Sequence, residues 1–158
     1  MNGFLIAPVV RADDLDATVS LFREYAASLP VDLSYQDFDR EIADVAGKYA
    51  PPRGALLLAR LSDGAAAGCV ALRPLAPDRC EMKRLYVAPS ARGTGLGRAL
   101  VDAIIGEARA RGYRELLLDT LPSMNAAIAL YRELGFRDIE PYYPGAPPGT
   151  VYLALRLD

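Results

Sequence analysis

The sequence predicts a mixed α/β fold, with a central sheet of six or seven strands and helices on both faces. Short apolar runs separated by turn-forming residues predict an antiparallel meander, at residues 55–61, 66–72 and 80–87. An alternation of strand and helix follows it, at residues 80–87, 96–108, 115–120 and 123–134. The run at 115–120 is continuously apolar at its centre, as in a strand covered on both faces.

The flanking elements are predicted from residues that cap helices and from residues that interrupt helices or strands. Residues 4–10 form a short apolar run with Pro8 inside it, which suits an edge strand. A helix capped by Asp13 or Asp14 runs to Pro30, and a second helix is expected over 34–49 with Ser34 as its cap. Near the end, Ser123 caps the helix at 123–134. A strand begins at Phe136, a loop rich in Pro, Gly and Tyr follows, and the last strand covers 150–157.

Composition excludes several classes of function. The 158 residues suggest a single domain, 1–158, and a net charge of −2 lacks the basic excess of a nucleic-acid binder. Histidine is absent, which excludes Ser-His-Asp triads, Cys-His pairs and HExxH zinc sites. The two cysteines, Cys69 and Cys80, are too few for a thiolate metal site and are expected out of register in the meander, with 69 opposite 84. We therefore expect no metal and no disulfide.

No signal for export or membrane insertion is present in the sequence. The start lacks a basic segment and a cleavage site, and no uncharged apolar stretch reaches about 18 residues. We expect a cytoplasmic protein without membrane or nucleic-acid partners, and a homodimer is possible.

A glycine-rich loop joins the strand at 80–87 to the following helix: Arg92-Gly93-Thr94-Gly95-Leu96-Gly97-Arg98. Glycines allow a ligand close to the backbone, and free N–H groups at a helix start favour an anion. The loop is neither a dinucleotide fingerprint nor a P-loop, because Arg98 replaces the third glycine and no Gly-Lys-Ser/Thr follows. Taken alone, such a loop is more often a simple connection; otherwise it predicts a phosphate cradle.

Together with the preceding Leu85-Tyr86-Val87, this loop resembles the hallmark of the GCN5-related N-acetyltransferases, Arg/Gln-x-x-Gly-x-Gly/Ala after a strand ending in Leu-x-Val. The segment ALYRELGF at 129–136 and the order of elements fit the same family. The resemblance covers most of the chain and implies a strongly bent sheet whose strands 80–87 and 115–120 splay apart.

The resemblance also implies acetyl-CoA as cosubstrate. Its pyrophosphate would bind the N–H groups of residues 93–98, its pantetheine would enter the splayed gap, and the acetyl carbonyl would meet the Val87 N–H. The residues expected to bind it are Leu85, Tyr86, Val87, Arg92, Gly93, Thr94, Gly95, Leu96, Gly97, Arg98 and Asn125. Leu85 and Val87 can also be ordinary core residues, and Asn125 or Ser123 can simply cap a helix.

The catalytic candidates are Glu81 and Tyr131. An amine acceptor must lose a proton, and without histidine the carboxylates are the main candidates for the base. Glu81 occupies the strand position where many family members carry a glutamate; a solvated carboxylate paired with Lys83 or Arg79 is an equal alternative. Asp119 is a weaker candidate. Tyr131 matches the family tyrosine that protonates the departing thiolate, and its alternative is a core tyrosine.

Acceptor recognition is the least determined part. Lys83 and Arg84 alternate along their strand, so one of them should face the acceptor and could hold a carboxylate; the alternative is a solvated sheet face. Arg84, Tyr35 and Tyr142 are the predicted acceptor-binding residues, with Tyr143 as an alternative to Tyr142.

The predicted reaction is direct transfer of an acetyl group from acetyl-CoA to a primary amine of a small, amino-acid-like molecule. A non-catalytic acyl-CoA sensor and acetylation of a peptide or protein amine are the alternatives. Acetylation of aminoacyl-tRNA is disfavoured by the net charge of −2.

Overall fold

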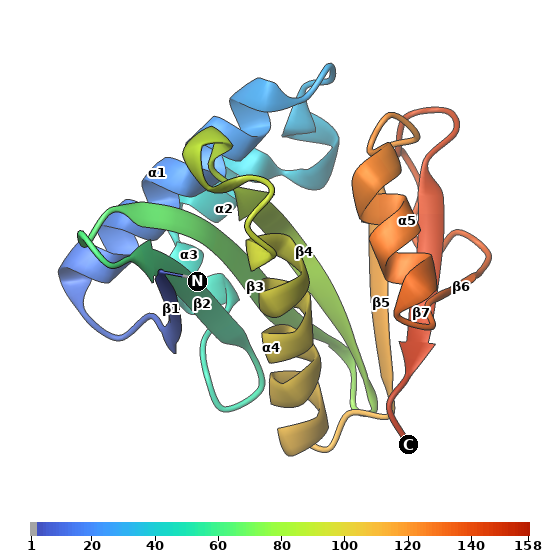
Figure 1. Cartoon of the computed structure of the whole chain (residues 1–158). Helices are drawn as coiled ribbons and strands as arrows, with labels where there is room; N and C mark the ends of the chain where they lie inside the picture. Colours follow the sequence, from blue (N-terminus) through green and yellow to red (C-terminus); the bar gives the residue numbers. More distant parts are fainter. Residues whose placement is uncertain (1–2) are drawn as a thin grey trace.

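The computed structural model describes residues 3–158, which form a seven-stranded mixed sheet in the order β1-β2-β3-β4-β5-β7-β6 (Figure 1). The predicted fold class is confirmed. The strands are β1 (Phe4–Pro8), β2 (Ala55–Leu61), β3 (Ala66–Ala76), β4 (Arg79–Val87), β5 (Glu115–Thr120), β6 (Arg137–Asp138) and β7 (Val151–Arg156). The strands β1 to β4 are antiparallel, and the short strand β1 lies at one edge as Pro8 indicates.

The strands β4 and β5 are parallel neighbours for only three residue pairs. Arg79 lies opposite Glu115, and the pairing ends at Glu81 opposite Leu117. In Figure 1 the two strands meet near the C-terminus of the chain and separate toward their other ends. The splay implied by the family resemblance is therefore present, and it opens the sheet beside the C-terminal half of β4.

Helices cover the two faces of the sheet. Helix α1 (Ala12–Ser28) packs on one face, where Leu21 and Phe22 join a core with Leu58 and Cys69. Helices α4 (Leu96–Ala110) and α5 (Asn125–Glu133) cover the other face, where their apolar stripes meet the larger core. The segment from β4 through α4 to β5 is thus the crossover that places a loop and a helix N-terminus at the open end of the splay.

The expected helix at 34–49 is wrong. The segment forms a 3₁₀ turn, η1 (Leu33–Gln36), and two short helices, α2 (Phe38–Ala43) and α3 (Val45–Lys48). Asp37 adopts a left-handed conformation with φ of 58°, and Asp44 caps α3 by accepting from the Gly47 N–H, so aspartates interrupt what an apolar stripe alone suggests.

Several predicted caps also differ from the structure. Asp32, not Ser34, caps η1. Arg11 is the N-cap residue of α1. Asp13 and Asp14 lie in its first turn, where their negative charges interact favourably with the helix dipole. Helix α5 begins after Met124 without a side-chain cap, so Ser123 is not its cap.

Two further details of the sheet differ from prediction. Pro74 lies inside β3 opposite Cys80, so the turn is at Pro77-Asp78 and β3 is longer than expected. Bulges shift the register so that Cys69 lies opposite Tyr86 rather than residue 84. Cys69 and Cys80 belong to different cores and are both free.

Within the described part of the chain, no helix is long and apolar enough to cross a membrane. The same residues, 3–158, contain no cluster of His, Cys, Asp or Glu that could hold a metal ion.

Candidate active site

A groove runs along the open edge of β4, between this strand, the start of α4 and the start of α5. It has a volume of about 500 Å³, within the range of roughly 300–1,000 Å³ that is typical of small-molecule sites. Of the residues predicted to bind acetyl-CoA, those that line this groove are Leu85, Tyr86, Val87, Arg92, Gly97 and Asn125. The groove therefore brings β4 and the glycine loop together with Asn125, which lies far from them in the sequence.

The glycine loop needs glycine at two positions for conformational reasons. Gly93 and Gly95 have φ values of 79° and 85°, a region that residues with a side chain rarely adopt. Gly95 is the N-cap residue of α4, which leaves the N–H groups of its first turn directed out of the helix. A Cβ atom at Gly97 would lie 3.7 Å from Val87 and would occupy space in the groove. Free N–H groups at a helix start of this kind can bind an anion.

The remaining predicted loop residues make protein contacts. Leu96 is buried in the core, and the Thr94 hydroxyl donates to the Ala91 carbonyl at 2.6 Å. Arg98 forms an exposed ion pair with Glu133 at 3.1 Å.

The backbone of β4 presents polar groups to the gap in the sheet. The Ala88 N–H donates to the Ala67 carbonyl on the β3 side at 2.8 Å. Because successive residues of a strand direct their N–H groups to alternate sides, Val87 directs its N–H away from β3, where β5 has separated. Arg92 Nε donates to the Val87 carbonyl from that same side at 3.2 Å. This edge of β4 can accept an extended ligand by hydrogen bonding.

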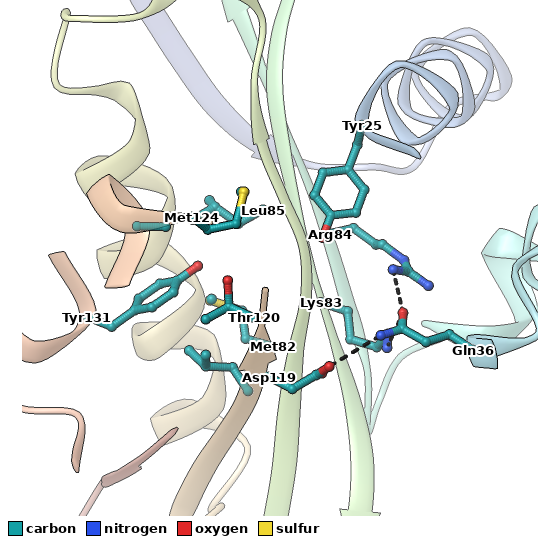
Figure 2. A pocket seen from close by; sticks show the side chains of 12 residues that line it. Tyr25, Gln36, Met82, Lys83, Arg84, Leu85, Asp119, Thr120, Met124 and Tyr131 are labelled. Carbon is teal, nitrogen blue, oxygen red and sulfur yellow. Dashed lines mark hydrogen bonds between the residues drawn. The ribbon is translucent and has the colours of Figure 1, made fainter. Parts of the chain in front are cut away.

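A small pocket of about 50 Å³ lies deeper in the splay, between β4, β5 and α5; we call it the junction pocket (Figure 2). Leu85, Thr120 and Met124 form part of its wall, and the Tyr131 ring points into it from α5 (Figure 2). Tyr131 is only 4% exposed and packs on Phe136, yet its hydroxyl has no hydrogen-bond partner within residues 3–158. Burial raises the pKa of this phenol, so it carries its proton at neutral pH.

Glu81 lies on the opposite face of β4 from the core residues Cys80 and Met82. It is 1% exposed, which overturns the alternative of a solvated carboxylate. Arg73 Nε donates to its Oε1 at 2.7 Å and the Tyr142 hydroxyl to its Oε2 at 2.6 Å. Burial alone raises the pKa of Glu81, but the charges of Lys83 and Arg73 and these hydrogen bonds outweigh it and lower the pKa. Glu81 is an ionised carboxylate with a fixed orientation.

Lys83 and Arg84 do not alternate as expected. Arg84 has φ of 61° at a bulge in β4, so both side chains reach the same glutamine, Gln36 of η1. They are 9% and 4% exposed, and the expected alternative of a solvated sheet face is wrong for both. A bulge of this kind re-aims a side chain and leaves little trace in the sequence.

The Arg84 guanidinium is already paired within the protein. It donates to both oxygens of Glu41 on α2, at 2.8 and 2.7 Å. Lys48 and the Tyr49 hydroxyl also donate to Glu41, each at 2.8 Å. Burial by itself raises the pKa of Glu41, but the hydrogen bonds and charges of Arg84 and Lys48 lower it to about 2. Arg84 thus ties α2 to β4; a role in acceptor binding stays a prediction.

The face of β4 that carries Glu81 and Lys83 is closed by contacts between distant segments. Gln36 Nε2 donates to Asp119 Oδ2 on β5 and to the Tyr143 hydroxyl, each at 3.3 Å, and Tyr143 donates to Asp119. Tyr35 accepts from Gln36 at 3.2 Å. Burial raises the pKa of Asp119. Both predicted loop tyrosines, 142 and 143, therefore meet carboxylates, Glu81 and Asp119 respectively.

Glu41, Gln36 and Arg73, which hold Arg84, Lys83 and Glu81 in place, were not identified from sequence. Glu41 lies at helical spacing from Phe38 and Val45, so a carboxylate on an apolar stripe was a usable signal. Gln36 carries no comparable signal, because a single amide in a polar segment is ordinary.

Comparison with known proteins agrees with this geometry. The model of the Acetyltransferase (GNAT) family matches residues 18–136. An uncharacterized N-acetyltransferase of Schizosaccharomyces pombe is 43% identical over 157 residues, covering 99% of this chain and 96% of that protein.

Two solved structures extend the comparison to the fold. The ribosomal-protein-S18-alanine N-acetyltransferase from Escherichia coli aligns with a TM-score of 0.72 and 26% identity, over 98% of this chain and 94% of that one. A GNAT family acetyltransferase from Elizabethkingia anophelis, solved with acetyl-CoA bound, has a TM-score of 0.69 at 20% identity and covers 99% and 100% of the two chains. With the glycine loop, the splayed strands and a family match over most of its length, the chain belongs to the GNAT family and is an acetyl-CoA-dependent acyltransferase.

Proposed function

We propose that this enzyme transfers an acetyl group from acetyl-CoA to a primary amine of a small molecule by direct attack. The observation that carries the proposal is the closed, charged pocket at the inner end of the groove. Gln36 of η1 bonds Asp119 of β5 and Tyr143 of the loop before β7, which favours a small acceptor over a polypeptide laid across the surface. The junction pocket of about 50 Å³ suits the reactive end of such a molecule.

The proposed binding of acetyl-CoA uses the groove. The N–H groups at the start of α4 and the loop from Arg92 to Arg98 hold the pyrophosphate, with charge from the two arginines. Leu85, Tyr86 and Val87 offer the strand edge, and Asn125 lies on the opposite wall.

In the proposed reaction the acceptor ammonium first releases one proton to solvent through a water held on Glu81. The nitrogen lone pair then forms the C–N bond to the thioester carbon, and the carbonyl electrons move to the oxygen, where the Val87 N–H donates. When the carbonyl re-forms, the C–S bond breaks and the sulfur takes the Tyr131 proton. The proton shed by the nitrogen restores Tyr131, so the products are the acetylated acceptor and the CoA thiol, with one proton released overall.

The environment of Glu81 favours a water relay over direct contact. Each of its oxygens already accepts one hydrogen bond, from Arg73 or Tyr142, and a carboxylate oxygen can accept a second from water. Its lowered pKa keeps it ionised at neutral pH and suits it to orienting a water. Tyr131 is available as a proton donor, because its raised pKa keeps the proton on its hydroxyl at neutral pH and this hydroxyl faces the junction pocket.

The test is release of free CoA thiol from acetyl-CoA with a panel of amino acids, polyamines, aminoglycosides and short peptides. Turnover of a small amine that falls in Tyr131→Phe supports the proposal. Turnover of peptides alone would instead support acetylation of a peptide amine, the reaction named for the Escherichia coli structure. Binding of acetyl-CoA without turnover of any amine would identify a sensor and overturn the assignments of Glu81 and Tyr131.

A further inference from the structure

Lys83 is a buried cation without a carboxylate partner in the described chain. Its side chain is 9% exposed, and its Nζ donates to Gln36 Oε1 at 3.3 Å. Among residues 3–158 no carboxylate oxygen lies within 4.0 Å of that nitrogen. An ammonium group taken out of water at this depth normally requires a paired anion. Burial lowers the pKa of Lys83 to about 8.

The nearby carboxylates are engaged elsewhere. Both Glu41 oxygens accept from Arg84, and one of them also accepts from Lys48. Glu81 is held by Arg73 and Tyr142. The Lys83 side chain lines the junction pocket, and its ammonium lies beside Gln36 with no carboxylate in contact (Figure 2).

Asp119 is the complementary case across the same pocket. It accepts from neutral donors, the Tyr143 hydroxyl and Gln36 Nε2, and within residues 3–158 no cationic nitrogen lies within 4.0 Å of it. Asp119 also lines the junction pocket, together with Tyr131 and Leu85. A buried carboxylate and a buried ammonium thus lie on one small space without touching each other.

The Gln36 amide bridges these two charges. Its oxygen accepts from Lys83 and from Arg84 at 2.7 Å, which fixes the orientation of the amide, and its nitrogen donates to Asp119 (Figure 2). An amide dipole presents a partial negative charge to the cation and a partial positive charge to the carboxylate. A molecule with a carboxylate and an ammonium a few atoms apart would present a full negative charge to Lys83 and a full positive charge to Asp119.

We propose that the acceptor is an amino acid, whose carboxylate binds Lys83 and whose ammonium binds Asp119. The bound amino acid would replace the 3.3 Å hydrogen bonds that Gln36 makes to these two side chains. The inference rests on the proposed function and specifies its substrate class. Because Lys83, Asp119 and Tyr131 share the junction pocket, an amine held by Asp119 lies beside the proposed sulfur position. Polyamines fit less well, since Lys83 and Arg84 would repel a second ammonium group.

The two anchors predict different responses to changes in the acceptor. A series built on one side chain contains the amino acid, its carboxamide and the amine that remains when the carboxyl group is removed. The carboxylate distinguishes the first from the other two, whereas all three carry the amine. Removing Lys83 should therefore affect the amino acid far more than the other two, and removing the Asp119 charge should affect all three alike.

The experiment measures kcat and KM for this series after a screen of the natural amino acids, in wild type, Lys83→Met, Lys83→Arg and Asp119→Asn. We expect wild type to prefer the acid over its carboxamide by about 10- to 100-fold in kcat/KM, the size expected for a charged hydrogen bond. Lys83→Met should raise KM for the acid and bring this ratio close to one, and Lys83→Arg should restore most of it. Asp119→Asn should lower kcat/KM for all three acceptors by similar factors and leave the ratio unchanged. Unchanged acetyl-CoA binding shows that each variant is folded.

A wild-type enzyme that acetylates amines but no amino acid would overturn this inference while the proposed function stands. The same follows if Lys83→Met keeps the wild-type preference for the acid, or loses rate equally on all three acceptors as a merely structural residue would. If no amine is acetylated at all, the proposed function itself fails. These outcomes separate the substrate class from the reaction.

Discussion

The two sides of β4 solve different binding problems with different parts of the chain. On the groove side, the end of β4 and the adjoining glycine loop form one wall from a single continuous stretch, Leu85 to Arg98, and the start of α5 forms the other wall. On the side proposed for the acceptor, the Gln36 amide of η1 and charged side chains of α2, β4 and β5 form a network around Glu41 and Gln36, and Arg73 of β3 holds Glu81 beside it. Backbone recognition suits a cosubstrate shared by a family, whereas a side-chain network can change with the acceptor.

The largest difference between the two sides should appear in stability. Glu41→Gln leaves the Arg84 guanidinium buried without a counter-charge, and we expect a loss of about 3–5 kcal/mol in the free energy of unfolding. The matched variant on the groove side is Glu133→Gln, which breaks the exposed pair with Arg98 and should cost less than about 1 kcal/mol. Urea denaturation of both variants measures the contrast. Equal losses would show that the buried network is no more important to the fold than a surface pair.

Between the two sides lies Tyr131, where we expect a large change in rate with little change in stability. Tyr131→Phe keeps the ring on Phe136 and removes only a hydroxyl that has no partner within residues 3–158. Loss of a positioned proton donor should lower kcat by about 100-fold, at the low end of general acid catalysis. The melting temperature and the Kd for acetyl-CoA are the controls. A variant with wild-type kcat would leave the thiolate to be protonated by solvent.

The contrast between the sides also explains what could be predicted from sequence. The strand bounds 55–61 and 115–120 and the fold class follow from local apolar patterns, and one wall of the groove, formed by β4 and the glycine loop, follows from a motif continuous in the chain. The acceptor side depends on a β4 bulge at Arg84 and on contacts between residues far apart, such as Gln36 with Asp119. Periodicity records which face of an element is apolar, and it carries no information about which distant polar groups meet.

The errors at 34–49 have the same origin. A stripe of apolar residues predicts one helix, but the αL conformation of Asp37 and the cap at Asp44 divide it. The interruption turns α2 so that Glu41 reaches Arg84, an arrangement stabilised by tertiary contacts that local propensity does not include.

The pH dependence of acceptor use should sharpen the comparison further. Burial lowers the pKa of Lys83 to about 8; Glu81 and Asp119 oppose this shift, and the like charges of Arg84 and Lys48 add to it. Above pH 8 the free enzyme therefore loses the Lys83 charge, whereas arginine keeps its charge. The ratio of kcat/KM for an amino acid in wild type to that in Lys83→Arg should fall about tenfold between pH 8 and pH 9.5. Comparing one acceptor in two variants cancels ionisation of the acceptor amine, and a flat ratio would contradict the assignment.

The smallest expected effect tests the backbone side alone. Gly95→Ala places a side chain at φ of 85°, which should cost about 1 kcal/mol although nothing lies within 4 Å of the added Cβ. Gly106→Ala also adds its Cβ in open space, but inside α4, where it should stabilise by about 0.5–1 kcal/mol. The two melting temperatures should thus shift in opposite directions, by a few degrees each. Only Gly95→Ala should weaken acetyl-CoA binding, because only this substitution disturbs the N–H groups of the loop. Equal Kd values for acetyl-CoA in the two variants would mean that these groups do not hold the pyrophosphate.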